Sequence, residues 1–498
     1  MLNEEQRLAY YTFADSFMKR QRGEMASPCR LYIGGGAGTG KSHVARAIIS
    51  LIACPCVLRR GGRERALVCA FQGKQATTLG GTTIHSIASV PDENSQTPAR
   101  RLSPKKKALW KDVTVLIIEE VSMVSAKMLA ALHVAAVASL GADASLPFGG
   151  LDIVALGDFS QLQPVASKGL ASGFSKHIGA AVLASSSSSA FGGQQLFLSM
   201  TAWVMLVQSK RFTEPLRGIV ERLRVGSCTS EDRDILNSTT IGAGNIRGND
   251  CHLSTMIVLR NKIRCALAVP LARSACARNN VCHYVSKARD KLRIGDSRLY
   301  TGRAWPAGLR SYVNQLEDNK TMDLPRETSL AIGMQVILRL QTQYVGAGVC
   351  NNSSGIIRKI VLHSKEPDMA PEYATDVYLR QLPLYVLVYV EDAHKRGLHL
   401  PGLDPGVVAI KPHTRTIRVT VPSRYSSSKK EYYIKRRQLP LCSGNISSVH
   451  RAQGESLDDC LLDLRQPQRK QGGRGIDDSA LIYVAISRAT SLEAIRLL

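Results

Sequence analysis

The sequence has no apolar run long enough to cross a membrane. Its longest apolar stretches, such as ALHVAAVASLGA from Ala131, fall well short of the roughly 20 residues that a bilayer-spanning helix needs. The N-terminus, MLNEEQRLAYYTF, carries early glutamates and lacks the basic stretch and apolar core of a secretory signal. We therefore expect an intracellular protein without a membrane span.

The sequence also lacks a regular spacing of cysteines. Twelve cysteines are scattered along the chain. The closest pair, Cys54 and Cys56, is separated by one proline. No paired CxxC motifs indicate a zinc site, and no ladder of spacings indicates disulfides. The cysteines are expected to be reduced thiols, with zinc binding as a minor alternative.

Acidic side chains are scarce relative to basic ones. The chain has 65 lysines and arginines against 40 aspartates and glutamates, which gives a formal net charge of +25. A charge so far from zero favours a polyanionic partner. Nucleic acid is the leading candidate, and an anionic membrane surface is the alternative.

Two sequence textures alternate along the chain, whose 498 residues suffice for three or four domains or subdomains. Residues 1–165 mix β-branched runs with helical patterns, as expected of a parallel sheet wound with helices. Short apolar strands separated by Gly, Pro, Asn and Ser predict a β-rich module at 333–440. The later stretch SALIYVAIS is typical of a buried strand, so this module is expected to interrupt a second α/β domain. LASSSSSAFGGQQ, from Leu183, predicts a flexible insertion.

A glycine-rich loop, GGGAGTGKSH at residues 34–43, is the strongest chemical signal. It fits the pattern G-x-x-x-x-G-K-[ST], with a strand-like RLYI before it and a helix-like HVARAIISLIA after it. Backbone N–H groups can approach phosphate there, Lys41 can reach the β- and γ-phosphates, and Ser42 can ligate Mg²⁺. A tight turn that is merely rich in glycine is the weaker alternative. The expected ATP-binding residues are Gly35, Gly36, Ala37, Gly38, Thr39, Gly40, Lys41 and Ser42.

Two adjacent glutamates end the strand-like pattern DVTVLIIEEVSMV, residues 112–124. Glu119 is expected to reach the magnesium shell, and Glu120 to orient and polarise the attacking water. Many NTPases carry an aspartate, one methylene shorter, at the first position, so the geometry here is expected to differ. Without the glycine-rich loop, a solvated strand end would be the better interpretation.

A third strand-like pattern, IVALGDFSQLQPV at residues 153–165, runs into a polar loop. Asp158 and Gln161 are placed where such a loop could sense the γ-phosphate. Alone, this segment is a weak signal. The three segments follow one another at spacings that suit successive strands of one sheet, and together they predict a site that hydrolyses a nucleotide.

These motifs resemble those of the Pif1 family of superfamily 1 helicases, and the resemblance covers nearly the whole chain. LNEEQ at the start is similar to the family's adenine-reading motif, which assigns Gln6 to the adenine. Residues 69–88, which include GGTTIHS, resemble the segment that touches single-stranded DNA and assign Thr82 and His85 to it. LIIEEVSMV and GDFSQLQPV depart from the family's usual forms.

The second half of the chain continues the resemblance. Residues 206–237 are similar to the stretch whose arginine reaches the γ-phosphate, and Arg211 matches that arginine. ALIYVAISRAT resembles the final motif, which makes Arg488 a second arginine finger. By residue type alone, an arginine in a surface pair is the alternative. SSVHRAQGESLDD is similar to the family's His-Lys-x-Gln-Gly block, with His450 assigned to DNA and Arg451 standing where lysine is usual.

The β-rich stretch resembles the small barrel-like insertion of the family, with Asn352 and Ser353 in a loosely matching turn. Within it, RYSSSKKEYYIKRRQ interleaves tyrosines with cations, which can follow a phosphate backbone while the rings stack on bases. Tyr432 and Lys435 are therefore assigned to DNA. An exposed strand pair with solvated charges is an equally good interpretation. The same pair of interpretations holds for KKK at 105–107 and for Tyr425, Tyr433, Lys429, Lys430, Arg436 and Arg437.

The resemblance implies an α/β fold of two RecA-like P-loop NTPase motor domains with a small inserted SH3-like, β-barrel-like subdomain. The first motor domain is expected at 1–200, with a small insertion at about 86–112 and the flexible loop at about 183–195. The second is expected at 201–332 and 441–498, and the inserted subdomain at 333–440. Closure of the two motor domains is expected to bring Arg211 and Arg488 to the phosphates.

The resemblance also implies an ATP- and Mg²⁺-dependent monomeric motor that moves 5′ to 3′ on single-stranded DNA and unwinds forked duplex DNA. Roles in DNA repair, recombination or telomere maintenance, in the nucleus or mitochondrion, follow from the family alone. The alternative is a nucleic-acid-binding relic of mobile-element origin that hydrolyses ATP weakly and does not unwind. A small-molecule P-loop kinase is a third hypothesis, which the two arginine-bearing motifs and the basic charge disfavour.

Overall fold

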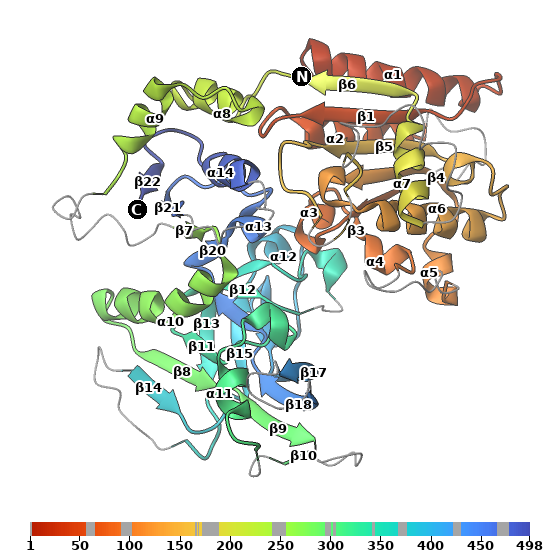
Figure 1. Ribbon diagram of the computed structural model, residues 1–498. Helices are drawn as coiled ribbons and strands as arrows, with labels where there is room; N and C mark the ends of the chain where they lie inside the picture. Colours follow the sequence, from red (N-terminus) through yellow and green to blue (C-terminus); the bar gives the residue numbers. More distant parts are fainter. Residues whose placement is uncertain are drawn as a thin grey trace. The chain divides into compact units, whose positions relative to one another are not determined.

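The chain divides into two compact units (Figure 1). The first contains residues 1–238, 454–458 and 469–494, and the second contains residues 239–453, 459–468 and 495–498. The domain limits expected from the sequence stay a prediction. The computed structural model describes residues 2–55, 65–90, 102–164, 167, 169–171, 189–241, 255–293, 300–301, 305–340, 344–366, 376–421, 430–465 and 478–498.

The first unit is built on a six-stranded sheet with the strand order β3-β2-β4-β5-β1-β6. Every neighbouring pair in it is parallel. Parallel strands need crossover connections, usually helices, which gives the predicted α/β architecture. The strands are β1 (Arg30–Gly35), β2 (Arg65–Ala70), β3 (Thr82–Thr83), β4 (Val113–Glu119), β5 (Asp152–Gly157) and β6 (Ala202–Leu206).

The helices of the first unit begin where the sequence provides caps or glycine turns. Asn3 caps the first helix through a reciprocal capping box with Gln6, and Ser125 caps α6. The helices are α1 (Glu4–Gln21), α2 (Lys41–Ile52), α3 (Gly73–Thr78), α4 (Ile84–Ile87), α5 (Pro104–Ala108), α6 (Ala126–Leu140), α7 (Ser189–Leu198), α8 (Leu216–Val225), α9 (Ser230–Asn237) and α14 (Asp478–Ile486), with 3-10 helices η1 (Val121–Met123) and η2 (Pro147–Gly150).

The amino ends of the central strands are tied to α1 by one buried carboxylate. Asp152, the first residue of β5, is fully buried and forms an ion pair with Arg20 near the end of α1. Its Oδ1 atom also accepts a hydrogen bond of 2.6 Å from the backbone N–H of Cys29, just before β1. This contact therefore fixes α1 and two strands at the end of the sheet opposite the glycine-rich loop.

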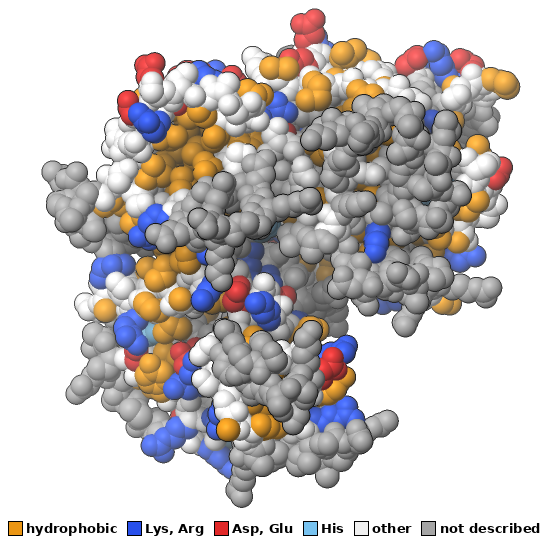
Figure 2. Space-filling model, in the orientation of Figure 1, with side chains coloured by type: hydrophobic (Ala, Val, Ile, Leu, Met, Phe, Trp, Pro, Cys, Tyr) orange, Lys and Arg blue, Asp and Glu red, His pale blue; other side chains and the backbone are white. Residues whose placement is uncertain are grey.

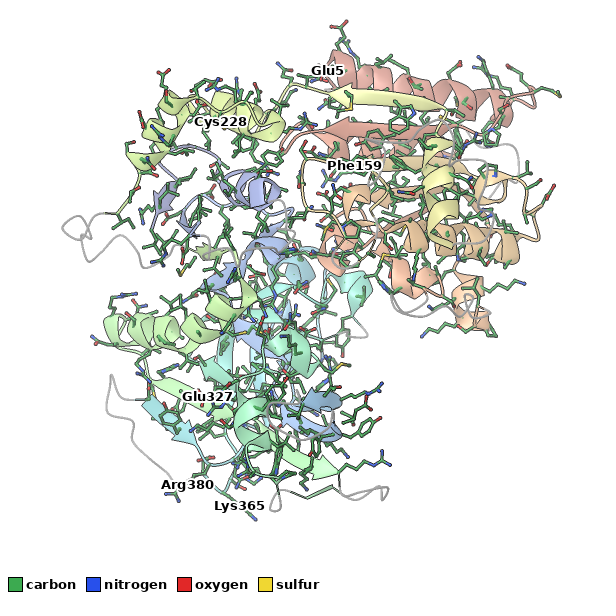
Figure 3. All side chains as sticks on the ribbon, in the orientation of Figure 1. Glu5, Phe159, Cys228, Glu327, Lys365 and Arg380 are labelled. Atoms are coloured by element: carbon green, nitrogen blue, oxygen red, sulfur yellow. The ribbon has the colours of Figure 1, made fainter. Side chains whose placement is uncertain are left out.

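The prediction of a flexible loop at 183–195 is wrong for the second half of that range. Residues from Ser189 onward form α7, and residues 183–188 lie outside the described part of the chain. The helix forms because its backbone lies directly on α6: a Cβ atom added to Gly193 would collide with the carbonyl of Ala126. Its Phe197 packs in a ring cluster with Tyr32, Trp203 and Phe159, which Figure 3 labels. This packing outweighs the local preference of a serine- and glycine-rich sequence.

Among its described residues, the second unit contains a smaller parallel sheet, two antiparallel sheets and one mixed sheet. The parallel sheet has the order β20-β7-β21-β22 and is formed by β7 (Thr255–Val258), β20 (Ile446–Ser448), β21 (Cys460–Asp463) and β22 (Ile495–Leu497). The helices of the second unit are α10 (Asn261–Arg278), α11 (Leu309–Asn314), α12 (Glu391–Lys395) and α13 (Val449–Ala452), with 3-10 helices η3 (Asp318–Thr321) and η4 (Val345–Ala347). Both units therefore have a parallel-sheet core, as the resemblance implies.

The stretch at 333–440 is rich in strands, as its sequence pattern predicts. A five-stranded antiparallel sheet has the order β16-β15-β13-β12-β19, and smaller sheets have the orders β10-β9-β18-β17 and β11-β8-β14. These sheets also include β8, β9, β10 and β11, which precede residue 333, and β19, which follows residue 440. An SH3-like barrel stays a prediction. The strands are β8 (His283–Lys287), β9 (Arg289–Arg293), β10 (Tyr300–Thr301), β11 (Glu327–Leu330), β12 (Gln335–Leu338), β13 (Ser354–Val361), β14 (Asp376–Leu379), β15 (Tyr385–Tyr389), β16 (Val407–Ile410), β17 (His413–Val421), β18 (Lys430–Gln438) and β19 (Leu441–Ser443).

The predicted buried strand SALIYVAIS is instead a helix. These residues form α14, in which Tyr483, Val484, Ala485 and Ile486 are all buried. A continuous apolar run has neither the period of a strand nor that of an amphipathic helix, so periodicity alone cannot decide between them.

Two further predictions concern membranes and thiols. Among the described helices, none combines the length and the apolar character that a bilayer span requires. The ten cysteines in the described part of the chain are free thiols.

Candidate functional site

The carboxyl end of the six-stranded sheet opens into a cavity of about 410 Å³ within the first unit. Ligands of open parallel sheets bind at this end, because the loops there carry the polar groups. Five separate sequence motifs contribute the predicted residues of its lining. The predicted residues that line it are Ala37, Gly38, Gly40, Lys41, Ser42, Glu119, Glu120, Gln161, Arg211 and Arg488.

The glycine-rich loop joins β1 to α2 and forms the floor of this cavity. Gly40 has the left-handed backbone (φ 87°) that lets α2 begin at Lys41. The Lys41 ammonium donates hydrogen bonds to the carbonyl oxygens of Gly35 and Gly36, at 2.6 and 3.0 Å. The loop therefore holds its lysine over its own backbone, where a phosphate oxygen could replace these acceptors.

The two glutamates after β4 have different surroundings. Glu119 is buried and accepts a hydrogen bond of 2.5 Å from the Ser42 hydroxyl. Burial, and next the neighbouring Glu120, raise the pKa of the Glu119 carboxyl to about 7. Glu120 has a left-handed backbone (φ 50°), and its buried Oε2 atom has no hydrogen-bond partner within the described residues. A strained residue with an unsatisfied oxygen in a cavity is typical of a functional position.

Two of the arginines that line the cavity, Arg211 and Arg488, form no ion pair with a carboxylate in the part of the chain that the structure describes. Arg488 is 1% exposed and donates to the carbonyls of Val484 and Glu455 and to the Ser487 hydroxyl. Arg211 donates to the carbonyl of Ser487 at 3.2 Å. Burial, and next the charge of Arg211, lower the pKa of Arg488 to about 10. Within the described residues neither arginine forms an ion pair, so the cavity holds positive charge that suits a polyanion.

Gln6, the residue assigned to the adenine, lies behind the glycine-rich loop. Its side-chain amide donates to the carbonyl of Thr39 at 2.9 Å and accepts from the backbone N–H of Asn3 at 3.1 Å. Gln6 is buried. It supports the loop in this structure, and its contact with an adenine stays a prediction.

The residues of the first unit that are predicted to contact DNA lie in β3 and in α4, the helix after it. Thr82 is in that strand, and His85 is exposed in α4. The carbonyl of His85 accepts a hydrogen bond of 2.7 Å from the Lys106 ammonium of α5, which also donates to the carbonyl of Ala88. Lys106 is therefore engaged with backbone, whereas Lys105 and Lys107 are exposed.

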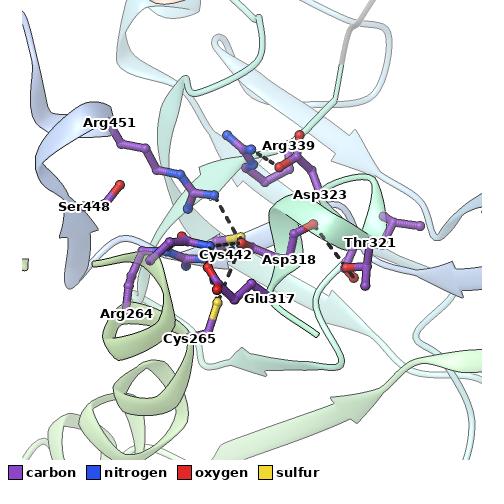
Figure 4. Close-up of polar contacts among 12 residues, drawn as sticks. Arg264, Cys265, Glu317, Asp318, Thr321, Asp323, Arg339, Cys442, Ser448 and Arg451 are labelled. Carbon is purple, nitrogen blue, oxygen red and sulfur yellow. Dashed lines mark hydrogen bonds and ion pairs between the residues drawn. The ribbon is translucent and has the colours of Figure 1, made fainter. Parts of the chain in front are cut away.

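In the second unit, the motif that carries His450 is held by Asp318 (Figure 4). The Arg451 guanidinium lies 3.2 Å from the Asp318 carboxylate, which also pairs with the buried Arg264 of α10. The sequence indicated only that Arg451 stands where the family carries lysine. Its side chain is committed to a buried carboxylate here. Burial lowers the pKa of the His450 side chain.

The side chains of β18 that are predicted to contact DNA alternate between the interior and the surface. Lys435 is exposed, and Tyr432 packs partly against the core of β17 and β18. Arg436 is fully buried, with hydrogen bonds of 2.8 and 2.7 Å to Asp290. Its predicted role beside a phosphate backbone is therefore wrong, because the strand period turns every second side chain inward. Residues 424–429 and the side chain of Lys430 lie outside the described part.

Several lining residues were not singled out from the sequence. His43 and Arg46 follow Lys41 in the first turns of α2, and Lys210 precedes Arg211. Arg46 and Lys210 add positive charge to the same cavity. The sequence offered one signal for His43, Arg46 and Lys210, which is that they lie close to the motif residues Lys41 and Arg211. The remaining lining residues are Gln75, Thr78 and Gly454.

Comparison with known proteins agrees with this arrangement. Residues 1–226 match the family model described as PIF1-like helicase. The chain is also 25% identical over 495 residues to the ATP-dependent DNA helicase PIF7 of Trypanosoma brucei brucei, and the alignment covers 93% of this chain. The chain resembles PIF1-like helicases over most of its length. It spans less than half of that relative, 43% of its length.

Two solved structures share the fold of this chain. The crystal structure of Pif1 helicase from Candida albicans aligns with a TM-score of 0.63 at 20% identity, over 100% of this chain and 94% of that one. The Pif1 helicase from Bacteroides in complex with ADP-AlF3 and ssDNA aligns with a TM-score of 0.62 at 18% identity, over 100% of this chain and 92% of that one. These alignments confirm the predicted fold class.

Proposed function

We propose that the chain is an ATP-dependent DNA helicase that couples ATP hydrolysis to 5′–3′ movement on single-stranded DNA. The observation that carries the proposal is the single cavity that holds Lys41, Glu120, Gln161, Arg211 and Arg488. The names of the curated relative and the two solved structures support it. They do not favour the alternative of a DNA-binding relic without unwinding.

In the proposed reaction the cavity residues act on the triphosphate of ATP. Lys41 leaves the loop carbonyls for the β- and γ-phosphates, and the N–H groups at the start of α2 face the same anions. The orphaned oxygen of Glu120 accepts a proton from the attacking water. Gln161 orients that water. Arg211 and Arg488 stabilise the charge that develops on the transferred phosphoryl group, and within the described residues neither is held in an ion pair with a carboxylate.

Magnesium fits the oxygen atoms at the edge of the cavity. The Ser42 hydroxyl and the Glu119 carboxylate lie in contact, and Mg²⁺ is commonly held by one or two protein oxygens together with substrate phosphates. When bound, the ion would neutralise phosphate charge during transfer. The described residues contain no cluster of three or more His, Cys, Asp or Glu that could hold a metal, so Ser42 and Glu119 are the proposed ligands.

Single-stranded and forked DNA are the proposed substrates, and the Bacteroides Pif1 structure with ssDNA supports this choice. Thr82, His85, His450, Tyr432 and Lys435 are the proposed contacts. On the face drawn in Figure 2, blue Lys and Arg side chains occur at several places among the described residues. Because the chain carries a formal net charge of +25, its grip is proposed to depend on the phosphate backbone, with little preference for base sequence. Monomeric action and a nuclear or mitochondrial role in repair, recombination or telomere maintenance stay predictions.

The test is ATP hydrolysis and fork unwinding by the wild-type chain and by Lys41→Ala. Loss of the ammonium removes the charge that stabilises the transferring phosphoryl group, so hydrolysis should fall by about 100-fold or more and unwinding should be lost. Lys111→Ala removes an exposed lysine of the same unit and should change neither rate.

Two results would contradict the helicase proposal. Normal unwinding by Lys41→Ala would show that unwinding does not depend on the cavity that holds Lys41. A wild-type ATPase rate that single-stranded DNA leaves unchanged would favour a P-loop enzyme that acts on a small molecule.

A further inference from the structure

A polar network around one buried carboxylate links three elements behind the phosphate-binding loop, and one of its members, Gln161, belongs to the proposed catalytic set. Its centre is Asp158, which follows β5 and is fully buried. One carboxylate oxygen, Oδ1, accepts hydrogen bonds from Arg224 Nε and Nη2 at 3.2 and 3.1 Å. The other, Oδ2, accepts from the Tyr483 hydroxyl at 2.9 Å and from the Gln161 amide at 3.4 Å. All four residues belong to the first unit.

Tyr483 connects this network to the backbone of the loop itself. While its hydroxyl donates to Asp158, it accepts a hydrogen bond of 3.2 Å from the N–H of Ala37. Tyr483 is 1% exposed. Burial, and next the charge of Asp158, raise the pKa of the tyrosine. The hydroxyl therefore keeps its proton and can serve both bonds at once.

Gly36 shows how closely the loop rests on this network. A Cβ atom placed on Gly36 would lie 3.3 Å from Arg224 Cδ and 3.4 Å from the Tyr483 hydroxyl. The absence of a side chain at Gly36 thus lets the loop contact both residues. The loop has support on the side away from the cavity, whereas its cavity side carries Lys41.

We propose that Tyr483 and Arg224, acting through Asp158, are positioning residues that hold the phosphate-binding loop in its nucleotide-binding shape. They touch neither nucleotide nor water in this role. Tyr483 fixes the loop through Ala37, Arg224 fixes the orientation of the Asp158 carboxylate, and Asp158 fixes Gln161. This inference rests on the proposed ATP-dependent function and deepens it, because it assigns the shape of the ATP site to residues 158, 224 and 483.

The test is the affinity of the non-hydrolysable analogue AMP-PNP, with Mg²⁺, for the full chain and for Tyr483→Phe. Phenylalanine keeps the ring and removes the hydroxyl, which leaves the Ala37 N–H without its acceptor and Asp158 without one donor. The Kd, measured by calorimetry, should rise roughly tenfold, as expected for loss of a hydrogen bond to a charged group.

Tyr32→Phe is the matched control. Tyr32 is also buried in the first unit, and its hydroxyl donates to the carbonyl of Gly157 at 3.3 Å. Its replacement should lower the melting temperature about as much as Tyr483→Phe does, while the Kd for AMP-PNP stays within about twofold of wild type, because no bond to the loop is lost.

The outcomes separate this inference from the helicase proposal. An unchanged Kd in Tyr483→Phe, or an equal rise in Tyr32→Phe, would overturn the positioning role, even if the wild type unwinds DNA. The expected Kd pattern in a chain that does not unwind DNA would support the positioning role and contradict the helicase proposal.

Arg224→Lys provides a second test if Tyr483→Phe does not fold. Lysine keeps the charge but cannot reproduce the paired contacts of the guanidinium with Asp158. The Kd for AMP-PNP should rise about threefold, since part of the interaction is retained. An unchanged Kd in this variant would overturn the proposed role of Arg224.

Discussion

At the scale of the residue, Glu119 is the position at which the chain departs from the usual pattern of its motif. The sequence indicates only that the side chain is one methylene longer than aspartate. The structure adds that the longer carboxylate reaches the Ser42 hydroxyl at 2.5 Å. The local geometry is therefore matched to glutamate.

We expect Glu119→Asp to hydrolyse ATP less well than the wild type, even though aspartate is usual elsewhere. The shorter side chain would withdraw from Ser42, and loss of this hydrogen bond should lower kcat/KM roughly tenfold. Steady-state phosphate release at several Mg²⁺ concentrations measures the effect. Glu221→Asp, at an exposed glutamate of α8, is the control. A faster Glu119→Asp would mean that Glu119 itself limits turnover.

Sequence alone predicts the residues of the phosphate site that lie in short, contiguous motifs. Lys41, Ser42, Glu119 and Glu120 fall within two such segments, and all four line the cavity. Tyr483 could not be predicted as a support of the loop. Its partner Ala37 is 446 positions away in the sequence, and no local pattern records such a contact.

At the scale of the element, Asp318 connects segments that the sequence places far apart. It lies in η3 and accepts from Asn261 and Arg264 of α10 and from Arg451 of α13. The Cys442 thiol of β19 lies 3.4 Å from the same carboxylate. Burial alone would raise the pKa of Asp318, but Arg264 and Arg451 outweigh it and hold the pKa below its usual range.

We expect Asp318→Asn to destabilise the second unit by about 3–5 kcal/mol at pH 7, because Arg264 would be left buried without its carboxylate. A carboxyl with a depressed folded-state pKa stabilises above its unfolded pKa and loses that contribution as the pH falls. The difference from wild type should therefore shrink below about pH 4. Hydrogen exchange of α10 and β19 at several pH values measures both effects.

Asp404→Asn is the control for this experiment. Asp404 is exposed in the same unit, so the same chemical change should alter stability by less than about 0.5 kcal/mol. Equal exchange rates in Asp318→Asn and the wild type at pH 7 would contradict the central role of Asp318.

Element types were predictable where the residues show a clear period. The strands RLYI and DVTVLIIE and the helix after Lys41 form as the sequence indicates. α14 was misread because its apolar run has no polar face, and α7 was misread because its stability comes from contact with α6. Both errors arise from tertiary packing, which local composition does not encode.

At the scale of the whole molecule, the excess of basic residues is the property that bears most directly on DNA. The formal net charge is +25, and proteins that neutralise phosphates release counterions from the strand. The fold class and the proposed kind of partner follow from composition and motifs. The residues that would contact DNA cannot be predicted in the same way. On β18, for example, Lys435 is exposed and its neighbour Arg436 is buried, and only the folded structure shows which of the two faces the surface.

We expect the affinity for a labelled oligothymidine to fall steeply with salt. If about five phosphates are neutralised, the Kd should rise roughly 100-fold between 50 and 200 mM monovalent salt. Fluorescence anisotropy measures it, and an oligonucleotide of mixed sequence is the control, with a similar slope expected. A Kd that salt leaves unchanged would show that the positive charge of the surface does not hold the strand.

In the six-stranded sheet of the first unit, the contacts that stabilise the fold and the residues of the proposed ATP site lie at opposite ends of the strands. Asp152, Arg20 and the backbone of Cys29 hold one end together, while the phosphate loop and Glu119 occupy the other. Inherited changes should therefore divide by strand end. Replacements near Arg20 should reduce the amount of folded protein in a cell while each surviving molecule keeps its normal turnover. Replacements near Glu119 should leave abundance intact and slow every molecule.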